Sequence, residues 1–206
     1  MTAPAVNNRV TQMLGVDYPI IQAPMGWIAR AQLASEVSNS GGMGIIETAS
    51  GEFDAIEAEV RKMRDLTTKP FGMNIALSYV KGSNIIDFVI QQGIKFVTTS
   101  SGSPAVCTEA LQAAGIKVFL VVSTLDMSLK ANDCGVDGLA AAGVEGGGFQ
   151  NTSPVSRIVL LAVVRSLTSV PIVAAGGRCD GLSMAAAFPM GAEGVQMGTR
   201  MLTCAE

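Results

Sequence analysis

The sequence predicts an α/β protein, a (β/α)8 TIM barrel that forms a single domain over residues 1–206. Two observations support this fold class. A pattern of a glycine, an apolar residue, a charged residue and an apolar run recurs along the chain, and segments with helical spacing lie between the runs. One strand and one helix, repeated roughly every 20–30 residues, are typical of this barrel. An open, doubly wound sheet is the alternative, and no shift in composition marks a second domain.

The repeated pattern ends one helix and begins one strand. Its clearest copies are QQGIKFVTTS (91–100), AAGIKVFLVV (113–122), DCGVDGLAAA (133–142) and PMGAEGVQMG (189–198), with NSGGMGIIET (39–48) as a looser fifth. Their glycines, Gly93, Gly115, Gly135 and Gly191, lie where the last turn of a helix needs a positive φ. Each following apolar run is short and continuous, as expected for a strand buried on both faces of a parallel sheet.

Counting such runs gives eight strands. We expect them at about residues 19–25, 42–47, 70–76, 95–100, 117–123, 137–143, 171–176 and 193–198. Apolar residues from Phe53 to Met63 recur at helical spacing, which predicts one of the intervening helices. Ser103-Pro104 and Ser153-Pro154 each place an N-cap serine before a proline at the first helical position, which predicts two more helix starts.

The C-terminal end of the barrel is expected to be incomplete. A barrel of this type usually takes about 250 residues, whereas this sequence stops a few residues after the eighth predicted strand. The eighth helix and the C-terminal region are therefore expected to be missing or reduced to MLTCAE (201–206). Either the outer wall is incomplete, or a partner covers it. A homo-oligomer that covers the flank of strand eight is one such arrangement, because an uncovered flank would expose apolar surface.

The composition excludes several classes of protein. A hydrophobic share of 49% and a charged share of 15% exclude a disordered chain. The net charge of −3 argues against a nucleic-acid partner. No apolar run approaches the ~20 residues that span a bilayer, and the start of the chain lacks a signal-peptide pattern. We therefore expect a cytoplasmic protein without a membrane partner.

Histidine is absent, which limits the chemistry further. Its absence removes histidine-dependent nucleophile triads and most zinc sites, so no metal site is expected. Cys107, Cys134, Cys179 and Cys204 lie far apart without a CxxC motif, and we expect isolated buried thiols.

Four predicted strands end in glycine-rich segments, QAPMGW (22–27), GVEGGGF (143–149), AAGGRCDG (174–181) and QMGTR (196–200). In a barrel these ends form the active-site face. The last two segments are neighbours, so Gly176, Gly177, Gly198 and Thr199 would bring bare backbone N–H groups together beside a helix that starts near Gly181. This arrangement favours a phosphate site. Tight turns are the plainer explanation of the glycines.

Single residues at these strand ends have two explanations each. Asn74 either contacts a ligand or is a satisfied core amide, and Glu145 either acts as an acid/base or caps backbone amides. Trp27 and Phe149 either stack on a planar ring or close the barrel mouth. Arg178 either helps a phosphate at longer range or is a solvated surface charge.

Five motifs, taken together and in order, resemble the nitronate monooxygenase family. They are PIIQAPMGW (19–27), KPFGMNIAL (69–77), GVEGGGF (143–149), VPIVAAGGRCDG (170–181) and GAEGVQMGTRM (191–201). The family was formerly called 2-nitropropane dioxygenase, and FMN-dependent enoyl-ACP reductases are its relatives. The resemblance covers about residues 12–203 and implies an FMN-binding TIM barrel, in agreement with the strand count.

The resemblance also implies the cofactor contacts, position by position. The flavin ring would meet the backbone of Ala23, Pro24 and Met25, the side chain of Asn74, and the glycines Gly147 and Gly148. The phosphate would meet Gly176, Gly177, Gly198 and Thr199, with Gln196 and Met197 beside it. Trp27 and Phe149 would line the substrate pocket.

One departure from the family pattern affects the mechanism. Members have a histidine, the catalytic base, where this chain has Phe149 after Gly147 and Gly148. Phenylalanine cannot transfer a proton, and no other histidine can replace it. The catalytic residues are therefore left unassigned.

Three functions stay open on the sequence. The first is an FMN-dependent oxidoreductase that oxidises alkyl nitronates with O2 through reduced flavin, as the resemblance implies. The second is an NAD(P)H-dependent flavin reductase acting on a quinone or an enoyl thioester, because hydride transfer to a flavin needs no histidine. The third is a catalytically inactive flavin-binding barrel. All three imply a small-molecule ligand.

Overall fold

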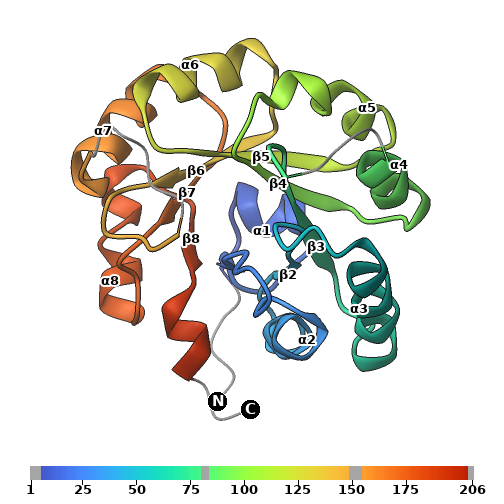
Figure 1. Ribbon diagram of the computed structural model, residues 1–206. Coiled ribbons are helices and arrows are strands. Elements are labelled where there is room, and N and C mark those ends of the chain that lie inside the picture. The colour runs from blue at the N-terminus through green and yellow to red at the C-terminus, as the bar shows by residue number, and fades with distance from the viewer. Residues whose placement is uncertain (1–5, 80–83, 149–154, 204–206) are drawn as a thin grey trace.

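The computed structural model describes residues 6–79, 84–148 and 155–203. Its centre is an eight-stranded parallel sheet in the order β1-β8-β7-β6-β5-β4-β3-β2. A parallel bridge between Ile21 and Met43 joins β1 to β2 and closes the sheet into a barrel, which helices surround (Figure 1). The predicted (β/α)8 architecture is confirmed, and the open doubly wound sheet is wrong.

All eight predicted strands are present, with shorter bounds. They are β1 Ile20–Gln22, β2 Gly44–Ile46, β3 Phe71–Ala76, β4 Phe96–Ser100, β5 Lys117–Val122, β6 Gly138–Ala142, β7 Ile172–Ala175 and β8 Gly194–Met197. The α-helices are α1 Arg9–Leu14, α2 Ala31–Asn39, α3 Phe53–Leu66, α4 Asn84–Gln91, α5 Thr108–Ala113, α6 Leu125–Asp133, α7 Arg157–Leu167 and α8 Gly181–Ala185. The 3-10 segments are η1 Pro104–Val106, η2 Phe188–Met190 and η3 Thr199–Thr203.

Two local predictions are confirmed, the positive φ of the glycines before the strands and the amphipathic helix α3. Gly93, Gly115, Gly135 and Gly191 all have φ between 66° and 93° and precede strands as expected. The apolar face of α3 is buried through Ile56, Val60 and Met63. This agreement follows because a left-handed residue and an amphipathic spacing are both local constraints.

The two predicted helix starts differ from the structure. Pro104 begins the 3-10 segment η1, where Ser103 makes no side-chain cap, and α5 follows only at Thr108. The predicted start at Ser153-Pro154 lies outside the described residues, and the described helix α7 begins at Arg157, after Ser156.

The part of the barrel interior nearest the N-terminal ends of the strands is filled by aromatic and aliphatic side chains. Phe96 and Phe119 meet edge to face with ring centroids 5.2 Å apart. Gly72 makes this packing feasible, because a Cβ there would lie 2.8 Å from the Phe96 ring. Val10 and Leu14 of α1 pack into the same cluster, so α1 plugs the end of the barrel where the strands begin (Figure 1).

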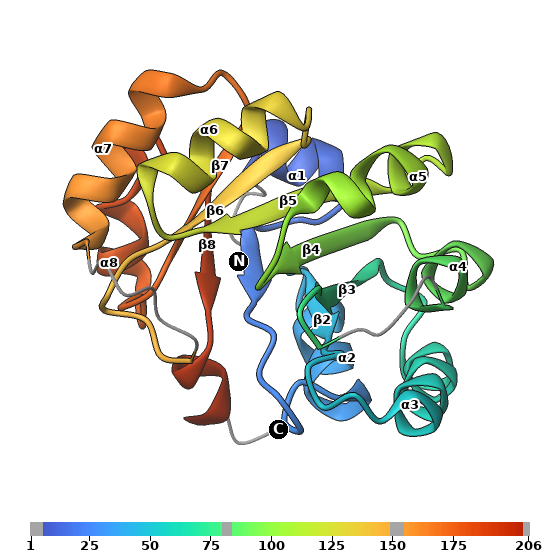
Figure 2. The same ribbon diagram turned by 45° about the horizontal axis from the view of Figure 1, so that its top comes forward.

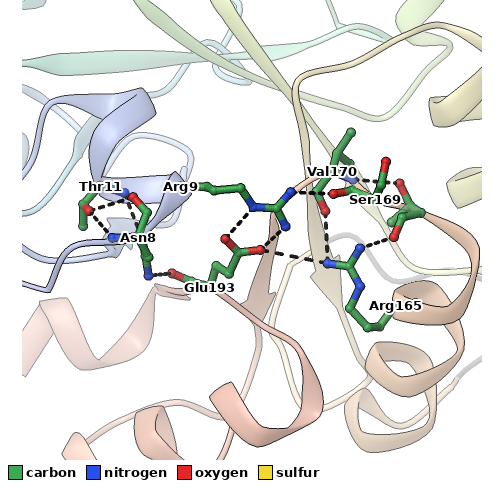
Figure 3. Close-up of polar contacts among 8 residues, drawn as sticks. Asn8, Arg9, Thr11, Arg165, Ser169, Val170 and Glu193 are labelled. Atoms are coloured by element: carbon green, nitrogen blue, oxygen red, sulfur yellow. Dashed lines mark hydrogen bonds and ion pairs between the residues drawn. The ribbon is translucent and has the colours of Figure 1, made fainter.

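A polar network fixes α1 to this end of the barrel (Figure 3). The guanidinium of Arg9 binds the carboxylate of Glu193, with Nε donating to Oε2 at 2.8 Å. Asn8 Nδ2 donates to the Glu193 carbonyl at 2.6 Å, and Arg165 of α7 approaches the same carboxylate at 4.0 Å. Glu193 directly precedes β8, so the network joins the start of α1 and the end of α7 to the N-terminal end of this strand.

The outer wall is thin next to β8. The helix between β7 and β8 is the five-residue α8, and after β8 the described chain forms only η3. Figures 1 and 2 show the outer layer of helices interrupted between η3 and α2. Leu182 of α8 is 81% exposed, and Leu202 of η3 is 47% exposed. Whether a second copy covers this flank stays a prediction.

No helix in the described ranges is long and apolar enough to cross a bilayer. Cys107 is buried as expected, and desolvation by burial, followed by the nearby Cys134, raises the pKa of its thiol to about 11. The prediction of buried thiols is wrong for Cys179, which is exposed, and Cys134 is half-buried. Cys204 lies outside the described residues.

Candidate active site

The loop after β1 is bound to β8 at the C-terminal end of the barrel. The backbone N–H of Ala23 donates to the Met197 carbonyl at 2.8 Å. A Cβ at Gly198 would lie 3.5 Å from the Sδ of Met25 and 3.5 Å from the Cβ of Ala23. The structure therefore brings two of the three predicted ring contacts, Ala23 and Met25, beside the predicted phosphate residue Gly198.

Above the aromatic layer, the inward positions of β6 to β8 are small or polar. Gly138 abuts the ring of Phe119, so Ala140 and Ala142 share its inward face. Val173 packs in the interior cluster, so Ala175 of β7 also points inward, and Gln196 pairs with it in register. These inward side chains are shorter than those of the aromatic layer, and Ala140, Ala175 and Gln196 are buried.

Gln196 is a buried amide with an unused donor. Gln196 is 5% exposed, and its Nε2 has no hydrogen-bond partner among the residues that the structure describes. A buried amide without a partner is costly, so this group marks a place where a ligand atom would be stabilised. Its neighbour Met197 packs outward into the core beneath the helices, so only the backbone of Met197 faces the loop after β1.

Asn74 on β3 is largely satisfied by the protein. Its Nδ2 donates to the carbonyl and the Oγ1 of Thr98, both at 3.0 Å, while Oδ1 has only the Ser100 hydroxyl at 3.4 Å. Of the two explanations of Asn74, these hydrogen bonds favour a core amide that is satisfied by the protein itself. It leaves Oδ1 as the one atom of Asn74 that is weakly engaged.

The predicted phosphate glycines lie in two loops that touch. A Cβ at Gly176 would be 2.7 Å from the backbone nitrogen of Gly146, so the loops after β6 and β7 approach too closely for a side chain. Gly177 has a φ of 59°. Within the described chain, no acceptor takes the backbone N–H groups of Gly177, Gly198 and Thr199. These amides lie at the ends of strands seven and eight, where barrels often bind a phosphate, and their role in such a site stays a prediction.

The expected helix beside the cradle is present and short. α8 begins at Gly181, with Asp180 capping Ser183, but it spans only five residues. We therefore assign no role to its dipole. Gly147 and Gly148 are exposed in the loop after β6, and Phe149 lies outside the described residues.

Glu145 is a helix cap. Its carboxylate accepts from the backbone N–H of Arg157, the first residue of α7, at 3.2 and 3.0 Å. The capping explanation of Glu145 is therefore confirmed by geometry, and a carboxylate at a helix N-terminus is stabilised by the helix dipole.

Two arginines lie near the Gly176–Gly177 turn, because Arg157 contacts it and Arg178 follows it in the chain. Arg157 donates through Nη1 to the Gly176 carbonyl, and a Cβ at Gly177 would lie 2.6 Å from this Nη1. Arg178 is only 6% exposed and donates through Nη1 to the Ser183 carbonyl. The alternative that Arg178 is a solvated surface charge is therefore wrong.

Sequence reasoning missed Arg157, although one signal was present. An arginine in the first turn of a helix is disfavoured by the helix dipole, and α7 has no acidic residue in that turn. Such a misplaced cation indicates another use for the charge.

Sequence reasoning also missed Glu47, which follows β2 directly. It is fully buried, accepts from the backbone N–H groups of Trp27 at 3.2 Å and Ser50 at 2.9 Å, and pairs with Arg30 at 3.2 Å. Trp27 has a φ of 60° and is 66% exposed at the rim. Among the described residues, no group of three His, Cys, Asp or Glu could hold a metal ion.

The nitronate monooxygenase family model matches residues 7–85 and 77–206. A (3aS,4S,5R,7aS)-5-hydroxy-7a-methyl-1-oxo-octahydro-1H-indene-4-carboxyl-CoA dehydrogenase of Rhodococcus jostii is 35% identical over 197 residues, which cover 96% of this chain and 55% of that protein. A nitronate monooxygenase of Pseudomonas aeruginosa is 31% identical over 247 residues, covering 98% of this chain and 70% of the relative.

Among solved structures, FabK from Thermotoga maritima superposes with a TM-score of 0.90 at 36% identity. The superposition covers 97% of this chain and 64% of that one. The chain spans little more than half the length of the first of these relatives.

Proposed function

Because the chain belongs to the nitronate monooxygenase family, we propose that it is an FMN-dependent oxidoreductase that oxidises alkyl nitronates with O2. The observation that carries the proposal is a set of unused donors at the C-terminal ends of β7 and β8. They are Gln196 Nε2 and the backbone N–H groups of Gly177, Gly198 and Thr199. Donors without acceptors suit an anionic, oxygen-rich ligand such as a flavin phosphate.

The residues present fit FMN. The bare amides of Gly177, Gly198 and Thr199 would hold the phosphate, and Gln196 would donate to a carbonyl of the ring. The ring would lie over the inward alanines of β6 and β7, beside the loop that begins at Ala23. When bound, the flavin supplies the redox chemistry, and the protein supplies amides and shape.

The engagement of the carboxylates in the described loops after β2 and β6 argues for a substrate that is already an anion. Glu145 caps α7, and Glu47 is engaged by Arg30 and two backbone amides. Glu52, the other carboxylate of the loop after β2, pairs with Arg30 at 3.1 Å. The carboxylates of the described loops after β2 and β6 are thus all engaged by a cation or by backbone amides. A nitronate has lost that proton before it binds, whereas a neutral nitroalkane has not. We therefore propose the nitronate as the substrate form.

An NAD(P)H-dependent flavin reductase acting on a quinone or an enoyl thioester is the second candidate, and the similarity to a carboxyl-CoA dehydrogenase favours the thioester. In this case NAD(P)H would be the electron donor. Anaerobic mixing separates the two. Bleaching of the flavin absorption by NADH or NADPH supports the reductase, and bleaching by an alkyl nitronate alone supports the first proposal.

A catalytically inactive flavin-binding barrel is the third candidate. Here the purified protein would be yellow, but neither a nitronate nor a nicotinamide would reduce its flavin. Phe149→His tests it further, because a large gain in nitronate oxidation would show that the pocket is otherwise intact. A colourless protein that gains no flavin absorption on incubation with FMN would contradict all three candidates.

A further inference from the structure

The repeated sequence pattern places charged residues at the N-terminal end of the barrel. Lys95 precedes β4, Lys117 begins β5, Asp137 precedes β6 and Glu193 precedes β8. Most of these charges are paired with a neighbour. Lys117 Nζ lies 2.7 Å from Asp137 Oδ1, and the carboxylate of Glu193 binds Arg9 (Figure 3). The charges at the starts of β5, β6 and β8 therefore neutralise one another or α1.

The part of this end that belongs to β3 and β4 carries cations alone. Lys69 lies two residues before β3, and Lys95 lies directly before β4. Among the residues that the structure describes, neither ammonium group has an ion-pair or hydrogen-bond partner. Two neighbouring strands thus begin beside uncompensated positive charges.

Arg64, in the last turn of α3, is a third cation beside them. Its Nη1 donates to Gln92 Oε1 at 2.6 Å, and its Nη2 donates to the Gln92 carbonyl at 2.5 Å. Both acceptors are neutral, so they fix the guanidinium without neutralising it. The C-terminal end of the α3 dipole supplies only about half a negative charge.

The three cations line one open cavity of about 310 Å³. The rest of its lining is largely apolar and includes Leu14, Met43, Phe71, Ile94 and Phe96. Of the described residues that line it, none is an aspartate or a glutamate. Its volume is at the lower end of the range of small-molecule pockets, and a cleft lined by charges of one sign concentrates ions of the other sign.

A role as ordinary solvated charges does not explain this arrangement. The chain has a net charge of −3, yet three of its cations meet around one cavity without a carboxylate. An inorganic anion would neutralise the cations but leave the apolar lining in water. A neutral apolar molecule would cover the lining but leave the cations unpaired. An anion with an apolar body satisfies both parts of the cavity.

We propose that this cavity binds a small organic anion, a carboxylate that carries a short apolar body. The carboxylate would lie among Arg64, Lys69 and Lys95, and the apolar body would cover the lining that includes Phe71 and Ile94. The cavity lies at the N-terminal ends of the strands, whereas the candidate active site lies at their C-terminal ends. The inference therefore goes beyond the proposed function and does not depend on it.

The experiment compares hexanoate with two probes that each lack one part of it. Hexanol lacks the charge, and inorganic phosphate lacks the apolar body. Isothermal titration calorimetry at low ionic strength measures the dissociation constants. The parent is expected to bind hexanoate at least about tenfold more tightly than either other probe, because a carboxylate among three cations makes charge-assisted bonds.

Lysine substitutions locate the bound anion. Lys69→Gln and Lys95→Gln should each weaken hexanoate by about fivefold, because both lysines are exposed and water screens part of their charge. The double variant should weaken it by about 25-fold if the two effects add. Lys62→Gln is the matched control, because Lys62 is exposed on α3, is not part of the lining and changes the net charge equally.

Thermal unfolding gives a second measurement. Without a probe, all three single variants should unfold at the temperature of the parent, since their side chains are exposed. Hexanoate should raise that temperature for the parent and Lys62→Gln but not for the double variant. A parent that binds hexanoate no more tightly than hexanol or phosphate would overturn the proposal, as would a double variant that keeps the affinity of the parent. Neither measurement needs a bound flavin, so failure of the FMN proposal leaves the result intact.

Discussion

The buried carboxylate of Glu47 accepts a hydrogen bond of 3.2 Å from the backbone N–H of Trp27. Trp27 holds a φ of 60°, which costs a non-glycine residue about 1 kcal/mol or more. The same carboxylate binds Ser50 and Arg30, so it ties the loops after β1 and β2 together. The left-handed turn at the rim is thus held by a carboxylate that directly follows β2.

Glu47→Gln is expected to release this loop. The uncharged side chain cannot neutralise Arg30 and loses one of two backbone acceptor contacts, so we expect a loss of about 1–3 kcal/mol in the free energy of unfolding. FMN affinity should fall severalfold because the loop that starts at Ala23 is less fixed. Trp27 is the only tryptophan in the chain, so its fluorescence maximum reports the loop directly. Glu57→Gln, exposed on α3, serves as control; an unchanged Trp27 spectrum in Glu47→Gln would contradict the argument.

Gly177→Val is expected to lose FMN while the barrel stays folded. Its Cβ would displace Arg157 Nη1, which lies 2.6 Å away, and would crowd the phosphate off the free amides. Loss of two charge-assisted bonds implies roughly a hundredfold weakening. Titration of FMN by fluorescence quenching measures it.

Gly93→Val is the matched control for that substitution. Gly93 has a φ of 66°, close to the 59° of Gly177, and a Cβ there would meet nothing within 4 Å. Both variants therefore suffer the same backbone strain, and only Gly177→Val should change FMN affinity. Equal affinities in the two variants would remove Gly177 from the phosphate site.

The fold could be predicted from the sequence because its signals are local and repeated. The glycines before the strands and the continuous apolar runs fixed the number and order of strands without any tertiary information. The short bounds of β1 and β2 could not be predicted, because they depend on the single bridge between Ile21 and Met43 that closes the barrel.

The candidate site could be predicted only in part, because some of its contacts join residues that are far apart in the sequence. Gly176, Gly177, Gly198 and Thr199 could be proposed because glycine-rich strand ends are visible in the sequence, and their role stays a prediction. Arg157 was not, because its approach to Gly176 joins residues 19 apart through the packing of two loops. The burial of Arg178 depends in the same way on tertiary contacts that a single sequence does not show.

The lowered pKa of Asp137 predicts how the free energy of unfolding changes at acidic pH. Burial alone would raise the pKa of this carboxyl, but hydrogen bonds from Gln112, Lys117 and the backbone N–H of Val118, with the charge of Lys117, outweigh it and hold the pKa below its usual value. A lowered pKa in the folded state stabilises the protein above the unfolded pKa of about 4. That stability is lost as the pH falls through the folded value.

In Asp137→Asn, the free energy of unfolding should therefore depend less on pH under acidic conditions. The difference in unfolding free energy between parent and variant is expected to be largest at neutral pH and to shrink below about pH 4. Urea unfolding at several pH values measures it. Asp65→Asn, exposed on α3, should run parallel to the parent at all pH values. A parent–variant difference that grows on acidification would contradict the assignment.

Gln196→Leu should raise stability and weaken flavin binding at once. The substitution removes a buried Nε2 that has no partner, which is worth about 1 kcal/mol or more in the ligand-free protein. If Gln196 binds the ring, the affinities for FMN and riboflavin should fall together. Gln22→Leu is the control for the direction of the change in unfolding free energy. Gln22 is also buried, but its Nε2 donates to the Ile45 carbonyl at 3.0 Å. We expect Gln22→Leu to lower the unfolding free energy in the same urea titration, and a Gln196→Leu protein that is destabilised like Gln22→Leu would show that the Gln196 amide is satisfied without a ligand.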